Sequence, residues 1–115
     1  MKHYALIFHA TRTLSPEEQK QRAVDIAAWV KQVSDAGIYL DPRNFGETAG
    51  NFSMEGDKIA SRKETSDPTF VTIVYFDSPS RDQAVNIARI HPGLHYGVTV
   101  EVREWSSPRE IVAKQ

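Results

Sequence analysis

Residues 86–105 read NIARIHPGLHYGVTVEVREW, and this stretch decides the fold. It has the pattern of an amphipathic helix end, a break at His91-Pro92-Gly93 and a following strand. One face of that strand carries Tyr96, Val98, Val100 and Val102. Glu101 and Arg103 alternate with them and so lie on the other face. The turn from helix to strand therefore predicts that His91, Glu101 and Arg103 lie near one pocket wall.

The N-terminal third predicts a strand followed by a helix. Residues 3–9 are largely apolar on both faces, which is typical of a strand covered on two sides. Ser15-Pro16 and Glu18 form a capping box that opens the helix, and Gly37 closes it. Trp29 lies at the margin of the helical stripe, so it either flanks the core or meets a partner chain. The predicted buried stripe is Ala23, Ile26, Ala27, Val30 and Val33, and the predicted solvent face is Lys20, Arg22, Lys31 and Gln32.

The middle of the chain predicts two strands that flank a ribbon. Residues 37–40 begin a strand that ends or becomes an edge at Asp41-Pro42, because proline lacks the donor that a sheet needs. Apolar residues around Gly56-Asp57 predict a hairpin within residues 44–65. Residues 69–76 are β-branched and aromatic, which favours a central strand. Ser78-Pro79 then repeats the helix-opening signal.

The order strand, helix, strand, ribbon, strand, helix, strand predicts an α+β fold. It is the ferredoxin-like βαββαβ sandwich with an inserted β-ribbon. Two helices cover only one face of four strands, although several strands are apolar on both faces. We therefore expect a twofold homodimer in which two sheets form an α+β barrel. The predicted domain spans residues 1–105, and residues 106–115 form a tail.

Composition narrows the class of protein. The chain has 115 residues and a formal net charge of −1, and its basic residues are scattered, which argues against nucleic acid as a partner. It contains no cysteine, as in proteins of reducing compartments. Its N-terminal apolar run is too short for a signal or a membrane span. These features predict a cytoplasmic protein that does not enter membranes.

The last third, ARIHPGLHYGVTVEVR at residues 88–103, resembles the YCII-related family, in particular its DGPF branch. The resemblance extends over nearly the whole chain, from MKHYALIF at the N-terminus to the Phe76-Asp77-Ser78 helix entry. It implies a dimeric α+β barrel and, for most members, no established activity. The Asp-Gly-Pro-Phe tetrapeptide is absent, because residues 59–64 read IASRKE.

Histidine and carboxylate pairs suit proton transfer, and some relatives of the wider group are thought to use such a pair. We nominate His91 and Asp41 as the catalytic pair. His91 has a structural alternative as a helix-terminal residue that favours the dipole, and Asp41 as a turn former. The nominated ligand-binding residues are Arg103, Glu101, Tyr96 and His9. Glu101 and Arg103 have an equally simple alternative as an interface ion pair.

No metal or cofactor is expected. His91 and His95 have the spacing of two helical metal ligands, but Pro92 and Gly93 prevent a shared helix. The resulting hypothesis is a homodimer that binds a small organic ligand, with cofactor-free acid–base catalysis as its candidate activity. The alternative is a non-catalytic regulatory module that acts through protein–protein contacts, at Trp29 or along the tail.

Overall fold

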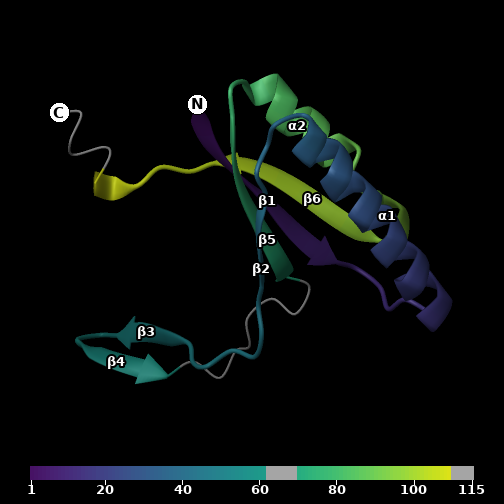
Figure 1. Ribbon diagram of the computed structural model, residues 1–115. Helices are drawn as coiled ribbons and strands as arrows, with labels where there is room; N and C mark the ends of the chain where they lie inside the picture. Colours follow the sequence, from purple (N-terminus) through teal and green to yellow (C-terminus); the bar gives the residue numbers. More distant parts are fainter. Residues whose placement is uncertain (62–69, 110–115) are drawn as a thin grey trace.

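The computed structural model describes residues 1–61 and 70–109 of the chain and has an α+β fold (Figure 1). Its elements are β1 (Lys2–Ala10), α1 (Pro16–Asp35), β2 (Asp41–Asn44), β3 (Phe52–Glu55), β4 (Lys58–Ser61), β5 (Phe70–Ser78), α2 (Arg81–Arg89), the 3-10 helix η1 (Pro92–Tyr96) and β6 (Val98–Glu104). The predicted class, with helices alternating with antiparallel strands, is confirmed.

Four strands form one antiparallel sheet in the order β2-β5-β1-β6. The two long strands β1 and β5 are central, as their apolar patterns predict. Pro42 lies in the edge strand β2, where its missing donor costs nothing to the ladder. β2 nevertheless begins at Asp41 and not at Gly37. Gly37 takes a left-handed conformation, and the Ile38 amide donates back to Val33 at the end of α1, so this segment cannot yet pair with a strand.

Helix α1 begins as the sequence predicts, with the reciprocal capping box of Ser15 and Glu18. Its buried face differs from the predicted stripe. Trp29 and Val33 are the buried residues, while Ala23 and Ala27 are exposed. The indole of Trp29 donates to the carbonyl of Ile87 at 3.0 Å, so this side chain belongs to the core and not to a partner surface. The bulky residues decide which face is buried, because they remove the most apolar area from water.

The chain between β5 and β6 also departs from its predicted boundaries. Helix α2 is capped by Ser80 and not by Ser78, whose hydroxyl is buried and donates to the carbonyl of Ser80. The helix ends at Arg89, and His91 is the N-cap of the short helix η1. Tyr96 therefore lies in η1, and the last strand starts two residues later than expected.

Both helices lie on the same side of the four-stranded sheet (Figure 1). The core between helices and sheet consists of Tyr4, Leu6, Phe8, Trp29, Val33, Ile38, Val74, Phe76, Ala84, Ile87 and Ala88. We call this side of the sheet the covered face. No described helix has the length and apolar character needed to cross a bilayer.

The other side of the sheet, here called the open face, carries two rows of side chains in register. The first row is Asp41, Tyr75, Ala5 and Arg103, taken in order across β2, β5, β1 and β6. The second row, in the same order, is Arg43, Ile73, Ile7 and Glu101. Each row is apolar in the middle and has opposite charges at its two ends.

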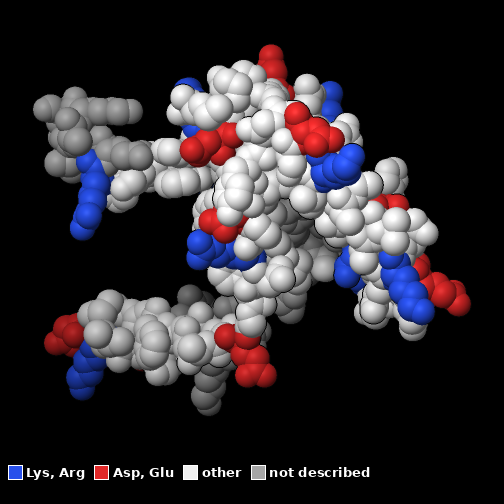
Figure 2. All heavy atoms as spheres, viewed as in Figure 1, with Lys and Arg blue, Asp and Glu red and all other residues white. Residues whose placement is uncertain are grey.

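Strands β3 and β4 form the predicted hairpin, which extends away from the sheet (Figure 1). Its turn lies at Gly56-Asp57, and Gly56 has a positive φ of 63°. Phe52, Met54 and Ile59 are 60–74% exposed on it. Residues 62–64, the end of the segment compared with the family tetrapeptide, lie outside the described residues, as does the tail beyond Arg109. On the viewed face acidic and basic side chains are interspersed, without a basic patch (Figure 2).

Candidate functional site

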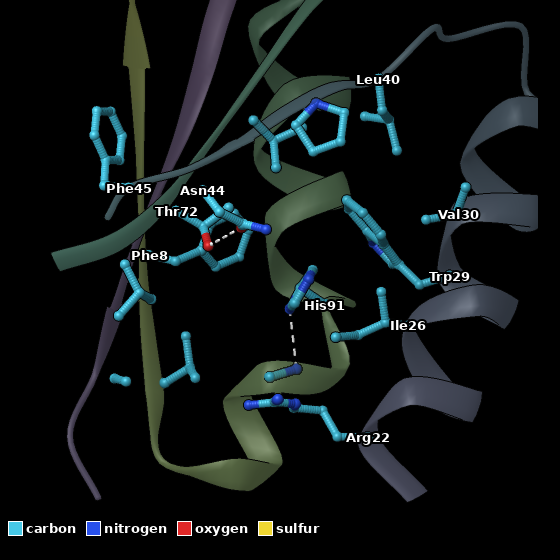
Figure 3. A pocket seen from close by; sticks show the side chains of 16 residues that line it. Phe8, Arg22, Ile26, Trp29, Val30, Leu40, Asn44, Phe45, Thr72 and His91 are labelled. Carbon is cyan, nitrogen blue, oxygen red and sulfur yellow. Dashed lines mark hydrogen bonds between the residues drawn. The ribbon is translucent and has the colours of Figure 1, made fainter. Parts of the chain in front are cut away.

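A cavity of about 690 Å³ lies between α1 and the covered face of the sheet (Figure 3). This volume suits a small organic molecule. The wall is mainly apolar, with Phe8, Ile26, Trp29, Leu40, Phe45 and Val74 among its residues. Its polar side chains are Arg22, Asn44, Thr72 and His91. The hydroxyl of Thr72 donates to Asn44 Oδ1 at 2.8 Å, so these two groups largely satisfy each other.

His91 is only 7% exposed and lies between two aromatic rings. Its ring centroid is 4.6 Å from that of Phe8 and 4.6 Å from that of Trp29. The side chain also caps η1, since Nδ1 accepts a hydrogen bond of 2.9 Å from the amide of Gly93. Capping is usually the role of a short polar side chain. Here the ring performs it and is thereby fixed in the cavity wall.

This hydrogen bond also determines the protonation state of His91. Because Nδ1 accepts, the neutral ring carries its proton on Nε2. Burial lowers the pKa of His91 to about 4, so the ring is neutral at physiological pH. The alternative role of a positive histidine at a helix terminus is therefore wrong.

Nε2 is open to the cavity. Within residues 1–61 and 70–109 it has no hydrogen-bond partner, and the one fully buried side-chain polar atom without a partner is the hydroxyl of Tyr4. His91 thus offers the cavity an N–H donor and not a basic nitrogen. A neutral imidazole of this kind can polarise a carbonyl or hold a carboxylate.

Gly93 permits this arrangement. A Cβ at position 93 would lie 2.9 Å from His91 Nδ1, 3.0 Å from its Cε1 and 3.3 Å from Val98 Cβ. The first distance is shorter than real Cβ contacts, and the other two are tighter than most. The His91-Pro92-Gly93 sequence, which predicts only a chain break, is in the structure the element that orients the imidazole.

The structure does not bring the nominated residues together within one chain. His91 lines the cavity on the covered face, whereas Asp41, Glu101 and Arg103 lie on the open face. Asp41 forms an ion pair of 3.1 Å with Arg43 and borders a separate hollow of about 360 Å³. His9 is opposite Thr99, on the same side of the sheet as Glu101.

Tyr96 joins η1 to α1. Its hydroxyl donates to Asp25 Oδ2 at 2.7 Å, and this bond lowers the pKa of the Asp25 carboxyl and raises that of the phenol. Tyr96 is absent from the residues lining the cavity. Its observed contact is thus a link between two elements that border the cavity.

Arg22 is the cavity residue that the sequence places wrongly in solvent. It lies one turn before Ile26 and two turns before Trp29, on the face of α1 that turns towards the sheet. The sequence contains a signal for this position. Ile26 and Trp29 follow Arg22 by four and seven residues, a spacing that places the three side chains on one helix face. No cluster of three or more metal-ligating side chains occurs in the described part of the chain.

A scan of the sequence against protein-family models finds no match, and a search of curated proteins finds no significant similarity. The resemblance to the YCII-related family therefore stays a prediction, and the geometry of the cavity carries the functional argument.

Proposed function

We propose that this chain is a cytoplasmic, YCII-related homodimer with a ferredoxin-like fold that binds a small organic ligand between α1 and the sheet. The strand order β2-β5-β1-β6 with antiparallel neighbours supports the ferredoxin-like assignment. The observation that carries the ligand proposal is the largely apolar cavity into which His91 presents a fixed N–H donor.

The chemistry of His91 sets the form of the candidate catalysis. The cavity wall contains no carboxylate among the described residues, so His91 has no acidic partner there within one chain. A neutral Nε2–H donor polarises a ligand carbonyl and stabilises a developing oxyanion without a cofactor. This role replaces that of a general base paired with Asp41.

Fragment binding followed by NMR tests the ligand proposal. Small apolar carbonyl compounds are expected to shift the signals of His91 Nε2–H and the Trp29 indole together. His91→Asn retains a side-chain acceptor for the Gly93 amide but removes the imidazole ring with its Nε2–H, and the shorter side chain should weaken binding. Asp41→Asn is the control and should leave binding unchanged. Fragments that bind only outside the cavity, or not at all, would contradict the proposal.

The open face supports the homodimer. Twofold rotation about an axis along the strands places Asp41 over the partner's Arg103 and Arg43 over the partner's Glu101. Rotation about an axis across the strands places Asp41 over the partner's Arg43 and Glu101 over the partner's Arg103. In both arrangements each charge meets its opposite and Ile7 and Ile73 meet apolar residues, so the face is complementary to itself.

Sedimentation at micromolar concentration should find a dimer, and a monomer would overturn this assignment.

The regulatory alternative has one observation in its favour. Phe52 and Met54 alternate along β3 and Ile59 pairs with Met54, so all three lie on one face of an exposed hairpin. Such a face suits a protein contact. Met54→Ser with Ile59→Ser should leave fragment binding unchanged under the ligand proposal. Loss of a cellular interaction with cavity binding intact would favour the alternative.

A further inference from the structure

Arg22 is the one charged side chain among the described residues that line the cavity. It is partly buried, and no described residue forms a hydrogen bond or an ion pair with its guanidinium. Two other arginines in the described part of the chain have carboxylate partners: Arg12 pairs with Glu18, and Arg43 with Asp41. A guanidinium that faces an apolar wall without a counterion is a binding group for an anion.

The position of Arg22 places the anion site at one end of the cavity. Arg22 extends from α1 on the side of the cavity where His91 and Gly93 begin η1 (Figure 3). Helix α1 and η1 are packed against each other, and the Tyr96–Asp25 hydrogen bond joins them. His91 Nδ1 faces Gly93 and this end of the cavity, whereas Nε2 lies on the opposite side of the ring (Figure 3). The guanidinium of Arg22 is therefore the charged group that an anion meets at this end.

The balance of donors and acceptors identifies the class of anion. A guanidinium only donates hydrogen bonds, and the cavity wall has no acidic side chain among the described residues. A planar carboxylate can accept two parallel bonds from the guanidinium fork. A dianion such as a phosphate ester would bring a second charge that no other cation in the described wall offsets. The remainder of the wall suits an apolar chain or ring.

We infer that Arg22 is the carboxylate-binding group of this cavity and that the ligand is an apolar monocarboxylic acid. The inference rests on the proposed ligand-binding function and specifies its chemistry. Arg22 supplies the charge and two parallel N–H donors. The aromatic and aliphatic wall between α1 and the sheet holds the ligand body.

Calorimetry with matched probes tests the inference. The full-length protein is titrated with octanoate and phenylacetate and with their neutral amides, which have almost the same shape. The carboxylates are expected to bind about tenfold more tightly than the amides, because their bonds to a guanidinium are charge-assisted. Arg22→Gln should abolish this preference while amide binding stays the same. Lys20→Gln removes an exposed charge from the same helix and should change nothing.

Each result has a distinct meaning. Equal binding of acids and amides to the native protein would overturn the carboxylate assignment but leave the cavity as a ligand site. An acid preference that survives Arg22→Gln would overturn the role of Arg22. If neither acids nor amides bind and fragments also fail, both the proposed function and this inference are wrong. Arg22→Lys retains the charge without the fork and should give an intermediate preference, and melting curves of each variant report its folding.

Discussion

The two faces of the sheet differ in whether their charged side chains are balanced. The covered face borders a cavity with a single unmatched cation, Arg22, and a neutral histidine. The open face carries two acids and two bases at the ends of two rows, with isoleucine, tyrosine and alanine between them. Under the proposed function, the unmatched charge binds a ligand, whereas the balanced set of charges is matched by a second copy of the chain. One sheet is therefore suited to two kinds of binding.

The largest expected effect comes from breaking the open face. Ile73→Asp places a charge in the middle of the proposed interface, and twofold symmetry places it there twice. The dissociation constant of the dimer should rise at least about a thousandfold, since burying an unpaired carboxylate is costly. Sedimentation velocity measures it. Val24→Asp on the exposed side of α1 is the control, and an intact dimer in Ile73→Asp would show that this face is not the interface.

One tryptophan lies on each side of the sheet, and replacing each in turn compares how much the two sides contribute to stability. Trp29 is 4% exposed in the core, whereas Trp105 is 40% exposed and stacks on His3 beside the open face. In the Ile73→Asp background, Trp29→Ala should lower the free energy of unfolding by about 4 kcal/mol. Trp105→Ala should lower it by about 1 kcal/mol, mainly through its hydrogen bond to Tyr4. Urea denaturation compares them, and similar losses would contradict the assigned core.

Acid should affect the covered face through His91. Burial lowers its pKa to about 4 from the ordinary 6.5, so the unfolded chain takes up the proton first as the pH falls. Above pH 6.5 the contribution of His91 to the free energy of unfolding should not change with pH. It should then decrease between pH 6.5 and 4 by up to about 3 kcal/mol.

The variant His91→Asn isolates that contribution. Asn does not titrate, so the difference in stability between the native protein and the variant should shrink as the pH falls from 6.5 to 4. Urea midpoints measured at several pH values provide the test. A difference that stays the same over this range would mean that His91 is not buried in its neutral form.

The smallest expected effect distinguishes the two dimer arrangements. Arg103→Glu should weaken the dimer by about tenfold, because one ion pair at a partly solvated interface contributes little. Adding Asp41→Arg should restore the affinity if the twofold axis runs along the strands. Adding Glu101→Arg should restore it if the axis runs across them. If neither second substitution restores the affinity, the charged side chains lie outside the interface.

Local signals in the sequence predict much of this fold. The capping box at Ser15, the hairpin turn at Gly56-Asp57 and the central position of residues 70–78 are all present in the structure. Each depends on interactions between residues close in sequence or on a long run of strand-forming side chains. Alternation along β6 also places Glu101 and Arg103 together on one face, as predicted.

The errors occur where tertiary packing overrides the local pattern. The stripe of Ala23 and Ala27 is regular but small, and Trp29 gains more by burial, so α1 turns another face to the sheet. That rotation carries Arg22 into the cavity wall. His91 is identified from the sequence as a candidate, but its tautomer depends on the hydrogen bond to Gly93. Asp41 shares no cavity with it because side chains alternate along β2, so that Asp41 lies on the open face while Pro42 and Asn44 line the cavity.

The contact between Gly93 and the ring of His91 limits how this cavity can be redesigned. Any side chain at position 93 would push the imidazole out of place, so a library aimed at new ligands gains nothing from varying residues 91–93. Ile26, Val30 and Phe45 contribute to the wall without holding the imidazole, and they are the positions to randomise. Variation there would change the shape accepted by the protein while keeping its polar anchor intact.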